Sequence, residues 1–404
     1  MPVAFRFSVV YLTLFCLATQ ISGSLIPNPW FTYRGLGRLW PMRDVTHWVA
    51  RTVFGVDVPL DDISGGETLF FWIQWSWVIV AAVVITAVWA LLDHRRRAPG
   101  LALPWAHLIV RLVLAASLLE YGMTKVMLTQ FPSPPLTALV TPAGDMTLSA
   151  LLWTTIGSAP AYQIATGCVE VLAGVLLLIP RTVPIGALLA IVSLLQVLLL
   201  NLTFDIGVKL VTTHLIVLGL ILLVPAIRMK PDTTLEVRPQ ADAALGMALP
   251  AALGVYLLAT QAWINWSFWQ VGGGGRPTSV LYGIWNVERL AVDGEARPAE
   301  LNDYDRRWRR VIFDAPDVVV FQRTDDSFAR YGVAFDEATG TFALTKGASR
   351  TWASRFTFDR GSDGRMRLDG EMDGHRIQAD LRRMDPSAFP LLNSGFRWVR
   401  PHDP

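Results

Sequence analysis

The sequence predicts an all-α membrane domain of about seven transmembrane helices, followed by a smaller all-β domain. Three observations predict this fold class. Hydrophobic residues make up 52% of the 404 residues, and sixteen residues are tryptophan. Before Trp269 the apolar residues collect in runs of about twenty, the length of helix that crosses a bilayer. After Gly275 the chain changes to charged residues and short alternating runs, which are typical of strands in water.

Seven apolar segments are the candidate transmembrane helices. The first of them has an alternative interpretation as a cleaved signal peptide, because small residues follow its short apolar core. Its loss would leave the sidedness of the later helices unchanged. The seven segments are residues 5–21, 69–92, 105–128, 161–179, 183–200, 208–224 and 244–264.

The short loops between these segments predict the orientation of the chain. If the helices simply alternate, the basic loops fall on one side, and the opposite connections, 129–160 and 201–207, contain no Lys or Arg. Basic loops stay in the cytoplasm. The sequence therefore predicts a multi-pass protein of a bacterial inner membrane, with a cytoplasmic amino terminus and a periplasmic or extracellular carboxy-terminal domain. The basic residues are 94–97, Arg181, Arg228 and Lys230.

Four regions follow from this pattern. Residues 1–103 hold two transmembrane helices and an external loop, and residues 104–229 hold a four-helix membrane core. Residues 230–272 contain the seventh helix and a linker, and residues 273–404 form the extracytoplasmic β domain. The net charge is only +2, so we expect no nucleic-acid partner; the expected partners are the lipid bilayer and a membrane or extracytoplasmic protein.

The β domain is expected to be an antiparallel meander or a lipocalin-like barrel. Eight short alternating runs are separated by turn sequences such as DEATG, RGSDG and DG, and closure of such a meander removes exposed strand edges. A closed barrel could hold an apolar ligand or could be filled by its own side chains. The filled barrel is favoured, because small barrels usually pack their interiors.

Two carboxylates are hard to explain by packing alone. Glu120 and Glu170 lie within apolar helices, where an ionisable group is costly and usually functional. At ~1.5 Å per residue, both lie in the outer half of the bilayer, about 12 and 15 Å from the ends of their helices. The sequence therefore predicts that both line a polar cavity and handle protons as catalytic groups.

Five further polar residues are candidates for contact with a ligand: Lys125, Tyr121, Asp205, Lys209 and His214. Three of them also have an ordinary interpretation. Asp205 could cap the amino terminus of the sixth helix, Lys125 could extend to the interface, and His214 could bridge helices by a hydrogen bond. The acids Glu120, Glu170 and Asp205 balance the bases Arg111, Lys125 and Lys209, as mutual pairing would require.

Several classes of chemistry are absent from the sequence. It contains no phosphate-binding Walker loop, no dinucleotide fingerprint, no CxxC motif and no residue pattern for a metal site. A redox reaction would therefore need a diffusible cofactor.

Three stretches of the chain resemble the DoxX-like membrane proteins, in particular a long form with extra amino-terminal helices and a soluble carboxy-terminal domain. The stretches are RLVLAASLLEYGMTKVMLTQFP, GSAPAYQIATGCVEVLAGVLLLIPRT and NLTFDIGVKLVTTHLIVLGLILL. The chain departs from that form at Gly207, where a proline is usual, and in its ending, PHDP. The residues that carry the resemblance are Arg111, Gly122, Lys125, Gly167, Glu170, Gly174, Asp205, Lys209 and His214.

The resemblance implies a four-helix DoxX-like core and a link to quinone chemistry, since some members belong to a thiosulfate-oxidising, quinone-reducing complex. We therefore expect a membrane oxidoreductase subunit that handles a diffusible quinone or a lipid in an outward-facing cavity among the third, fourth and sixth helices. The rival hypothesis is a non-enzymatic anchor that binds lipid or assists the assembly of exported proteins. In that case the buried charges serve only to hold the helices together.

Overall fold

The computed structural model describes residues 2–27, 35–59, 67–93, 102–228, 243–300, 303, 307–347, 349–393 and 398–399. The chain divides into two compact units. The helical unit comprises Met1–Phe131 and Ala159–Trp269, and the barrel unit comprises Pro132–Ser158 and Gln270–Pro404. The basic stretch at 94–97, Lys230 and the PHDP ending, which the sequence analysis used, lie outside the described residues.

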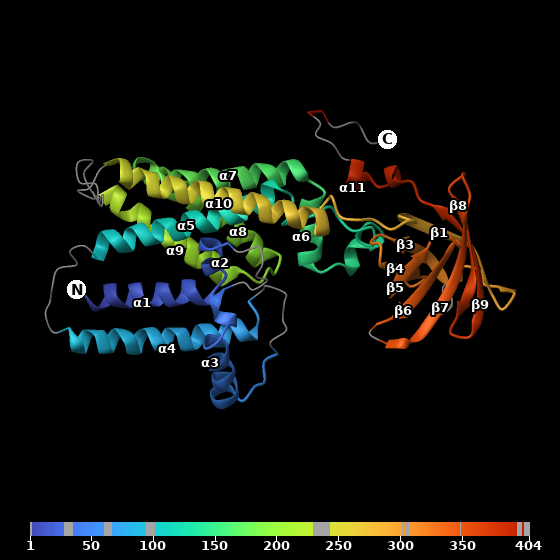
Figure 1. Cartoon of the computed structure of the whole chain (residues 1–404), viewed down its shortest axis with the longest axis horizontal. Coiled ribbons are helices and arrows are strands. Elements are labelled where there is room, and N and C mark those ends of the chain that lie inside the picture. Colours follow the sequence, from blue (N-terminus) through green and yellow to red (C-terminus); the bar gives the residue numbers. More distant parts are fainter. Residues whose placement is uncertain are drawn as a thin grey trace. The chain divides into compact units, whose positions relative to one another are not determined.

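A helix of the helical unit occupies each of the seven predicted apolar segments (Figure 1). Apolar side chains without an internal proline or glycine make α4 continuous, and prolines in the first turn begin α7 and α8, where a missing amide hydrogen costs nothing. The seven helices are α1 (Val3–Ala18), α4 (Leu69–Leu92), α5 (Ala102–Val126), α7 (Pro160–Leu178), α8 (Val183–Thr203), α9 (Lys209–Arg228) and α10 (Ala243–Gly272). Short elements α2 (Ile21–Leu25), η1 (Leu36–Arg38), α3 (Met42–Val49), η2 (Ala50–Phe54) and η5 (Pro180–Thr182) connect them.

By length and composition, four helices among the described residues can cross a membrane: Leu69–Leu92, Leu103–Val126, Pro160–Leu178 and Pro180–Thr203. The apolar helices Val3–Ala18 and Lys209–Val224 are shorter. The protein is therefore a helical membrane protein. The predicted number of seven spans remains a prediction, since the helices are in the expected places but not all have the expected length.

One apolar core holds the helical unit together. It joins α5, α7, α8 and α9 and extends to Phe15 of α1, Ile21 of α2 and Leu257 of α10. Helix α5 packs along α7, α8 packs on both α7 and α9, and α1 packs on α4. The four-helix core that the sequence placed at 104–229 thus consists of α5, α7, α8 and α9, and α1 and α2 cover part of it.

The barrel unit contains eight antiparallel strands in sequence order, closed by pairing of the first strand with the last. The prediction of an antiparallel barrel is confirmed, and each predicted run became one strand. Asp293–Gly294 and Asp373–Gly374 turn the chain with positive φ at both residues, as the tightest hairpins require. The strands are β1 (Gly283–Val292), β3 (Trp308–Phe313), β4 (Val318–Arg323), β5 (Phe328–Asp336), β6 (Thr341–Lys346), β7 (Ser349–Arg360), β8 (Arg365–Met372) and β9 (His375–Arg383), with β2 (Glu295–Ala296) as a short addition to β1.

Aromatic side chains fill the interior of the barrel. Trp285, Phe313, Phe321, Phe342 and Phe356 are all less than 2% exposed and belong to one apolar cluster. Their rings lie against one another; those of Phe342 and Phe356, for example, have centroids 5.4 Å apart. The structure therefore agrees with the filled-barrel interpretation.

The connection between α5 and α7 belongs to the barrel unit. It holds η3 (Ala138–Val140), η4 (Ala143–Asp145) and α6 (Leu148–Gly157). Leu136 packs on the outer wall of the barrel with Ile284, Ile312 and Val320, and its amide donates to Asp314 at 3.2 Å. The sequence analysis had placed this connection in the membrane core at 104–229. The final described elements are η6 (Pro386–Ala388) and α11 (Pro390–Asn393).

Candidate functional site

A buried ion pair joins the two helices that pack most extensively in the helical unit. Nζ of Lys125 on α5 donates to both carboxylate oxygens of Glu170 on α7, at 2.6 and 2.5 Å. Lys125 is 7% exposed and Glu170 is 1% exposed. The sequence predicts Lys125 nearly at the outer end of its helix and Glu170 about 15 Å from the end of its own, both in the outer half of the bilayer. The structure brings the two side chains into direct contact. Lys125 therefore does not extend to the interface but points into the bundle.

Glycines allow the two helices to approach closely beside this pair. A Cβ added to Gly167 would lie 2.7 Å from both the carbonyl oxygen of Gly122 and Cβ of Lys125. A Cβ added to Gly122 would lie 2.8 Å from the carbonyl oxygen of Gly167. Each glycine stands three residues before a member of the ion pair, so it shares a helix face with that member. Backbone contact at the glycines places the charged side chains together.

Two polar contacts between α7 and α8, here called the seam, lie beside the ion pair and closer to the surface of the bundle. The hydroxyl of Ser193 lies 3.5 Å from Oε1 of Glu170, and Nε2 of Gln196 donates to the hydroxyl of Tyr162 at 3.0 Å. Ser193 and Gln196 are half-buried, whereas Tyr162 is 46% exposed. The ion pair thus has a polar neighbour on the side that faces out of the bundle.

Glu120 and Tyr121 contact the beginning of the chain instead. The hydroxyl of Ser24 donates to Glu120, and the amide of Gln20 donates to the hydroxyl of Tyr121. Both partners lie at or beside α2. The sequence predicts a common site for Glu120 and Glu170, but the two carboxylates have different partners. Glu120 and Lys125 lie on different faces of α5, so Lys125 contacts Glu170 on α7 whereas Glu120 contacts Ser24 on α2.

His214 is fixed in a chain of hydrogen bonds between α9, α1 and α4. Nδ1 lies 2.7 Å from the carbonyl oxygen of Leu210, which can only accept, so Nδ1 carries the hydrogen. Nε2 then accepts from the hydroxyl of Tyr11 at 2.6 Å, and that hydroxyl accepts from Nε1 of Trp75 at 2.8 Å. The ring also stacks on Phe15. The interpretation of His214 as a helix-bridging hydrogen bonder therefore fits the geometry.

Asp205 and Lys209 form an ion pair at 2.8 Å at the end of the helical unit where α8 connects to α9. The Asp205 side chain is 87% exposed, and the hydrogen bond from Lys209 lowers the pKa of its carboxyl. The interpretation of Asp205 as the cap of the sixth helix is wrong, because α9 begins four residues later, at Lys209, with Asp205 in a left-handed turn.

Glu67, a residue that the sequence analysis missed, caps this helix. Its Oε1 accepts from the amides of Leu210 and Val211, the latter at 3.1 Å, and its own amide donates to Gly207. Burial raises the pKa of the Glu67 carboxyl, although these amides act in the opposite direction. Glu67 directly precedes the apolar run of α4, but no local pattern indicates that it caps a helix some 140 residues later.

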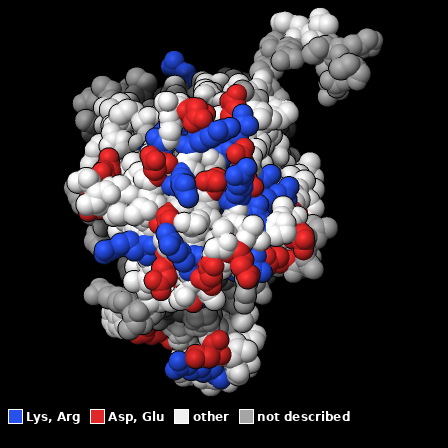
Figure 2. All heavy atoms as spheres, turned by 90° about the vertical axis from the view of Figure 1, so that its right-hand side faces the viewer, with Lys and Arg blue, Asp and Glu red and all other residues white. Residues whose placement is uncertain are grey.

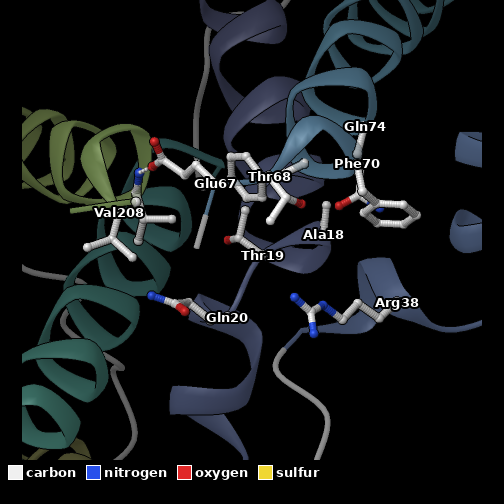
Figure 3. Close-up of a pocket in the computed structure, with 12 residues that line it drawn as sticks. Ala18, Thr19, Gln20, Arg38, Glu67, Thr68, Phe70, Gln74 and Val208 are labelled. Carbon is white, nitrogen blue, oxygen red and sulfur yellow. Dashed lines mark hydrogen bonds between the residues drawn. The ribbon is translucent and has the colours of Figure 1, made fainter. Parts of the chain in front are cut away.

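A small cavity of about 40 Å³ adjoins Glu67, with room for a few water molecules (Figure 3). None of the seven predicted site residues lines it. Its polar lining residues include Gln20, Arg38 and Gln74. No sequence pattern marks them as a site, except that Gln74 is an amide inside an apolar run. The lining residues are Ala18, Thr19, Gln20, Arg38, Glu67, Thr68, Phe70, Phe71, Gln74, Gly207, Val208 and Val211.

The remaining charged residue of the predicted set, Arg111, donates to the carbonyl oxygen of Leu178 at 3.4 Å rather than to an acid. Among the residues that the structure describes, no three His, Cys, Asp or Glu side chains gather as metal ligands would. Both cysteines are free, Cys16 partly buried and Cys168 exposed. The Lys125–Glu170 pair is thus the buried site at which a lysine donates to both oxygens of a carboxylate.

Comparison with known proteins gives one informative match, to the uncharacterized protein YwoB of Bacillus subtilis (strain 168). The two sequences are 39% identical over 116 residues, which is 28% of this chain and 71% of YwoB. The chain belongs to the same family as YwoB. Neither a protein-family model nor a solved structure matches the chain, and the name of YwoB states no activity.

Proposed function

We propose that the protein is a DoxX-like subunit of a membrane oxidoreductase that exchanges protons with a quinone-like or lipidic molecule at the Lys125–Glu170 pair. One observation carries the proposal: both oxygens of a carboxylate that is 1% exposed accept from a lysine that is 7% exposed, between two apolar helices. Replacement of a buried ion pair by apolar side chains is often neutral or stabilising, so the pair is weakly explained by stability. Ionisable groups at such depth usually mark a proton or substrate path.

The proposed topology is that of a bacterial inner-membrane protein with seven spans, a cytoplasmic amino terminus and the barrel on the outer side. The pairing of Arg6 on α1 with Asp93 at the end of α4, at 2.9 Å, supports it. The two groups meet at the ends that the loop charges assign to the cytoplasm. Arg6 also lies over the ring of Trp89, an amphipathic side chain suited to an interface.

The ligand would approach through the seam between α7 and α8. The described cavity beside Glu67 has a volume of only about 40 Å³, which is too small for a quinone ring. The seam instead offers hydroxyls of Tyr162 and Ser193 on the way to Glu170. A carbonyl oxygen of the ligand would accept from Lys125 or from the serine hydroxyl, as quinone sites require polar donors in an apolar surrounding.

The chemistry at the pair is a proton exchange. Reduction of a quinone to a quinol takes up two electrons and two protons. Transfer of a proton from Nζ of Lys125 to a ligand oxygen leaves a neutral amine beside Glu170, and uptake of a proton from water by the pair restores it. Two such transfers, each followed by uptake of one proton, supply both protons of the quinol. The electrons would come from a partner protein in the membrane or outside it. The residues that carry the DoxX resemblance support this assignment, since Gly122, Lys125, Gly167 and Glu170 lie in mutual contact.

The test measures ligand binding by the purified protein in lipid nanodiscs. Quinone and lipid that copurify are extracted and identified by mass spectrometry, and an added short-chain quinone is titrated. We expect Glu170→Gln and the double variant Lys125→Met/Glu170→Leu to lose at least about tenfold in quinone affinity, the value of one or more lost charge-assisted hydrogen bonds. The control is Cys168→Ala, an exposed change on the same helix.

The double variant separates function from packing. It removes both charges together, so no charge is left unpaired, and we expect it to keep the folded state. A double variant that stays folded and binds quinone as tightly as the native protein would contradict the proposal. Wild-type protein that shows neither a copurified ligand nor saturable quinone binding would contradict it as well.

A second candidate function is a non-enzymatic anchor that presents the barrel to an exported partner. The filled interior of the barrel favours it, because the buried rings of Trp285, Phe342 and Phe356 occupy that interior. In this case the helices hold the barrel at the membrane through three covalent connections, at the two ends of Pro132–Ser158 and at Gln270. Biological activity that survives the double variant but is lost on truncation at Gly273 would favour this candidate over the first.

A further inference from the structure

The external loop of the helical unit contains a short helical segment that has one side packed on α4 and the other side uncovered. We define the crosswise segment as η1, α3 and η2, from Leu36 to Phe54. Figure 1 shows α3 running across the beginning of α4 rather than along it. From the position and the side chains of this segment we infer that it is an interfacial anchor, which lies in the headgroup region of the outer leaflet with its uncovered apolar side chains in the bilayer.

The packed side fixes the depth of the segment. Val49 and Ala50 form an apolar cluster with Phe70 and Ile73 of α4, to which Trp77 also belongs. These partners lie between the second and the ninth residue of α4, so the contact extends roughly 1.5 to 12 Å below the end of that helix. Since α4 is 24 residues long, about 36 Å, it exceeds a bilayer core of about 30 Å by about 3 Å at each end. The contact therefore begins at the interface and reaches the outer part of the core.

Buried hydrogen bonds hold the segment at this level. Thr46 is fully buried, and its hydroxyl accepts from Nε1 of Trp77 at 3.0 Å. Nε2 of Gln74 donates to the carbonyl oxygen of Gly37 at 2.7 Å. The segment is therefore a fixed part of the helical unit, because Thr46 and the carbonyl oxygen of Gly37 have their partners on α4 itself.

The uncovered side carries large apolar residues that water would not favour. Trp40 is 77% exposed, Val53 65%, Trp48 63%, Phe54 50% and Val45 38%. Tryptophan and phenylalanine beside arginine are the composition of helices that lie in a membrane interface.

Two features of the surroundings select lipid over a protein as the occupant. The adjoining surface of α4 also exposes apolar side chains, with Leu69 56% and Trp72 44% exposed, so the uncovered side continues the surface that faces the membrane. Two arginines of the segment pair with nearby acids, Arg43 with Asp44 and Arg51 with Asp57 just beyond η2. An oppositely charged protein surface is therefore not required, and insertion should depend little on salt or on anionic lipid.

The test places spin labels on the full-length protein in nanodiscs of phosphatidylethanolamine and phosphatidylglycerol. The chain has two cysteines, so Cys16→Ala/Cys168→Ala provides a background in which single cysteines are introduced at Val45 and Phe54. Collision rates with oxygen, which enters the bilayer, and with a nickel chelate, which stays in water, report the depth of each label.

We expect the ratio of oxygen to nickel collisions at positions 45 and 54 to exceed the ratio at Ala338→Cys severalfold. Ala338 is an exposed turn residue of the barrel and serves as the water reference. The ratio should stay below that at Val84→Cys, which is 54% exposed in the middle of α4 and serves as the bilayer reference. Ratios equal to that at Ala338 would overturn the inference.

Labels at 45 and 54 that neither reagent reaches, or that broaden one another between molecules, would also overturn it, since a second copy or another protein would then cover the segment. A further measurement leaves the cysteines native. Lipids brominated near the headgroup should quench less of the tryptophan fluorescence in Trp40→Phe/Trp48→Phe than in the native protein. Equal quenching of the two proteins would contradict the inference even if the cysteine-free background failed to fold.

Discussion

The two units of the protein distribute their side chains in opposite ways. In the helical unit the exposed residues of α4 are apolar, as at Val80, Val83 and Ile85, while the charged pair Lys125 and Glu170 is buried. In the barrel the largest side chains are inside, and charged residues cover the outer wall. Figure 2 shows acidic and basic side chains interspersed on the side where β7, β8 and β9 lie in Figure 1.

The charges on the barrel form an alternating row across neighbouring strands. Arg289 on β1 stands opposite Asp380 on β9, Asp380 opposite Arg367 on β8, and Arg367 opposite Asp359 on β7. All four side chains are exposed. Opposite charges at such positions favour the observed strand register.

The contrast follows from the two solvents. Water drives large apolar side chains into the barrel. Hydrocarbon gives no comparable force between helices, so the helical unit depends on close approach of small residues and on paired polar groups. Truncation of a buried side chain should therefore destabilise the barrel most. A larger side chain in place of a glycine should destabilise the helical unit.

The largest effect is expected for Trp285→Ala in the barrel. The side chain is fully buried and its Nε1 donates to Leu281 at 2.9 Å, so truncation leaves a cavity and should cost about 3–5 kcal/mol. Urea unfolding of the barrel in the intact, detergent-solubilised protein, followed by proteolysis, measures the change. The control Trp398→Ala removes a side chain that is 91% exposed and should change stability by less than about 0.5 kcal/mol. Equal urea midpoints for Trp285→Ala and Trp398→Ala would contradict the view that burial of large apolar side chains stabilises the barrel.

An intermediate effect is expected for Gly167→Ala in the bundle. The new Cβ would lie 2.7 Å from the carbonyl oxygen of Gly122, and relief of that overlap should cost about 1–3 kcal/mol. The thermal unfolding midpoint in detergent measures the change. Gly23→Ala is the matched control, since a Cβ at Gly23 meets nothing within 4 Å. A midpoint for Gly167→Ala at or above that of the control would show that close helix approach is not needed.

The smallest effect is expected for Glu67→Gln, which sharpens the comparison because it tests a single half-buried acid at the beginning of α9. Burial raises the pKa of Glu67 above 4.5, so the folded state binds its proton more tightly than the unfolded state. Its contribution to stability is then full below pH 4.5 and decreases as the pH rises through the raised value. The difference in unfolding midpoint, native minus Glu67→Gln, should therefore decrease with rising pH.

The exposed acid Asp57, replaced by asparagine, serves as the control for this pH series. The difference in unfolding midpoint between the native protein and Glu67→Gln could instead increase with pH. That result would show that the amides of α9 that donate to Glu67, rather than its burial, dominate the shift of its pKa.

Much of the fold followed from local patterns. The eight strands were predicted because period-two alternation and the DG turns are properties of neighbouring residues, and both were confirmed. The positions of the seven apolar helices followed from the length of each run. The place of the 132–158 connection did not, because Leu136 and Val140 pack on strands that follow some 150 residues later.

The candidate site was less predictable. Depth along the helices correctly suggested that Lys125 and Glu170 could meet, since rise per residue is fixed. Depth alone could not show that Glu120 and Glu170 have different partners. Those partners depend on which face of α5 each neighbouring helix covers. Glu67 was missed because a cap supplied from another part of the chain has no sequence motif.

The sequence by itself determined which segments prefer hydrocarbon, where the strands alternate and which ionisable residues interrupt apolar runs. Only the tertiary structure decided that Lys125 pairs with Glu170, that Glu67 and not Asp205 caps α9, and that aromatic side chains fill the barrel. The reason is physical. Periodicity and hydropathy are set by neighbours in the chain, whereas a pairing depends on which faces of distant elements meet.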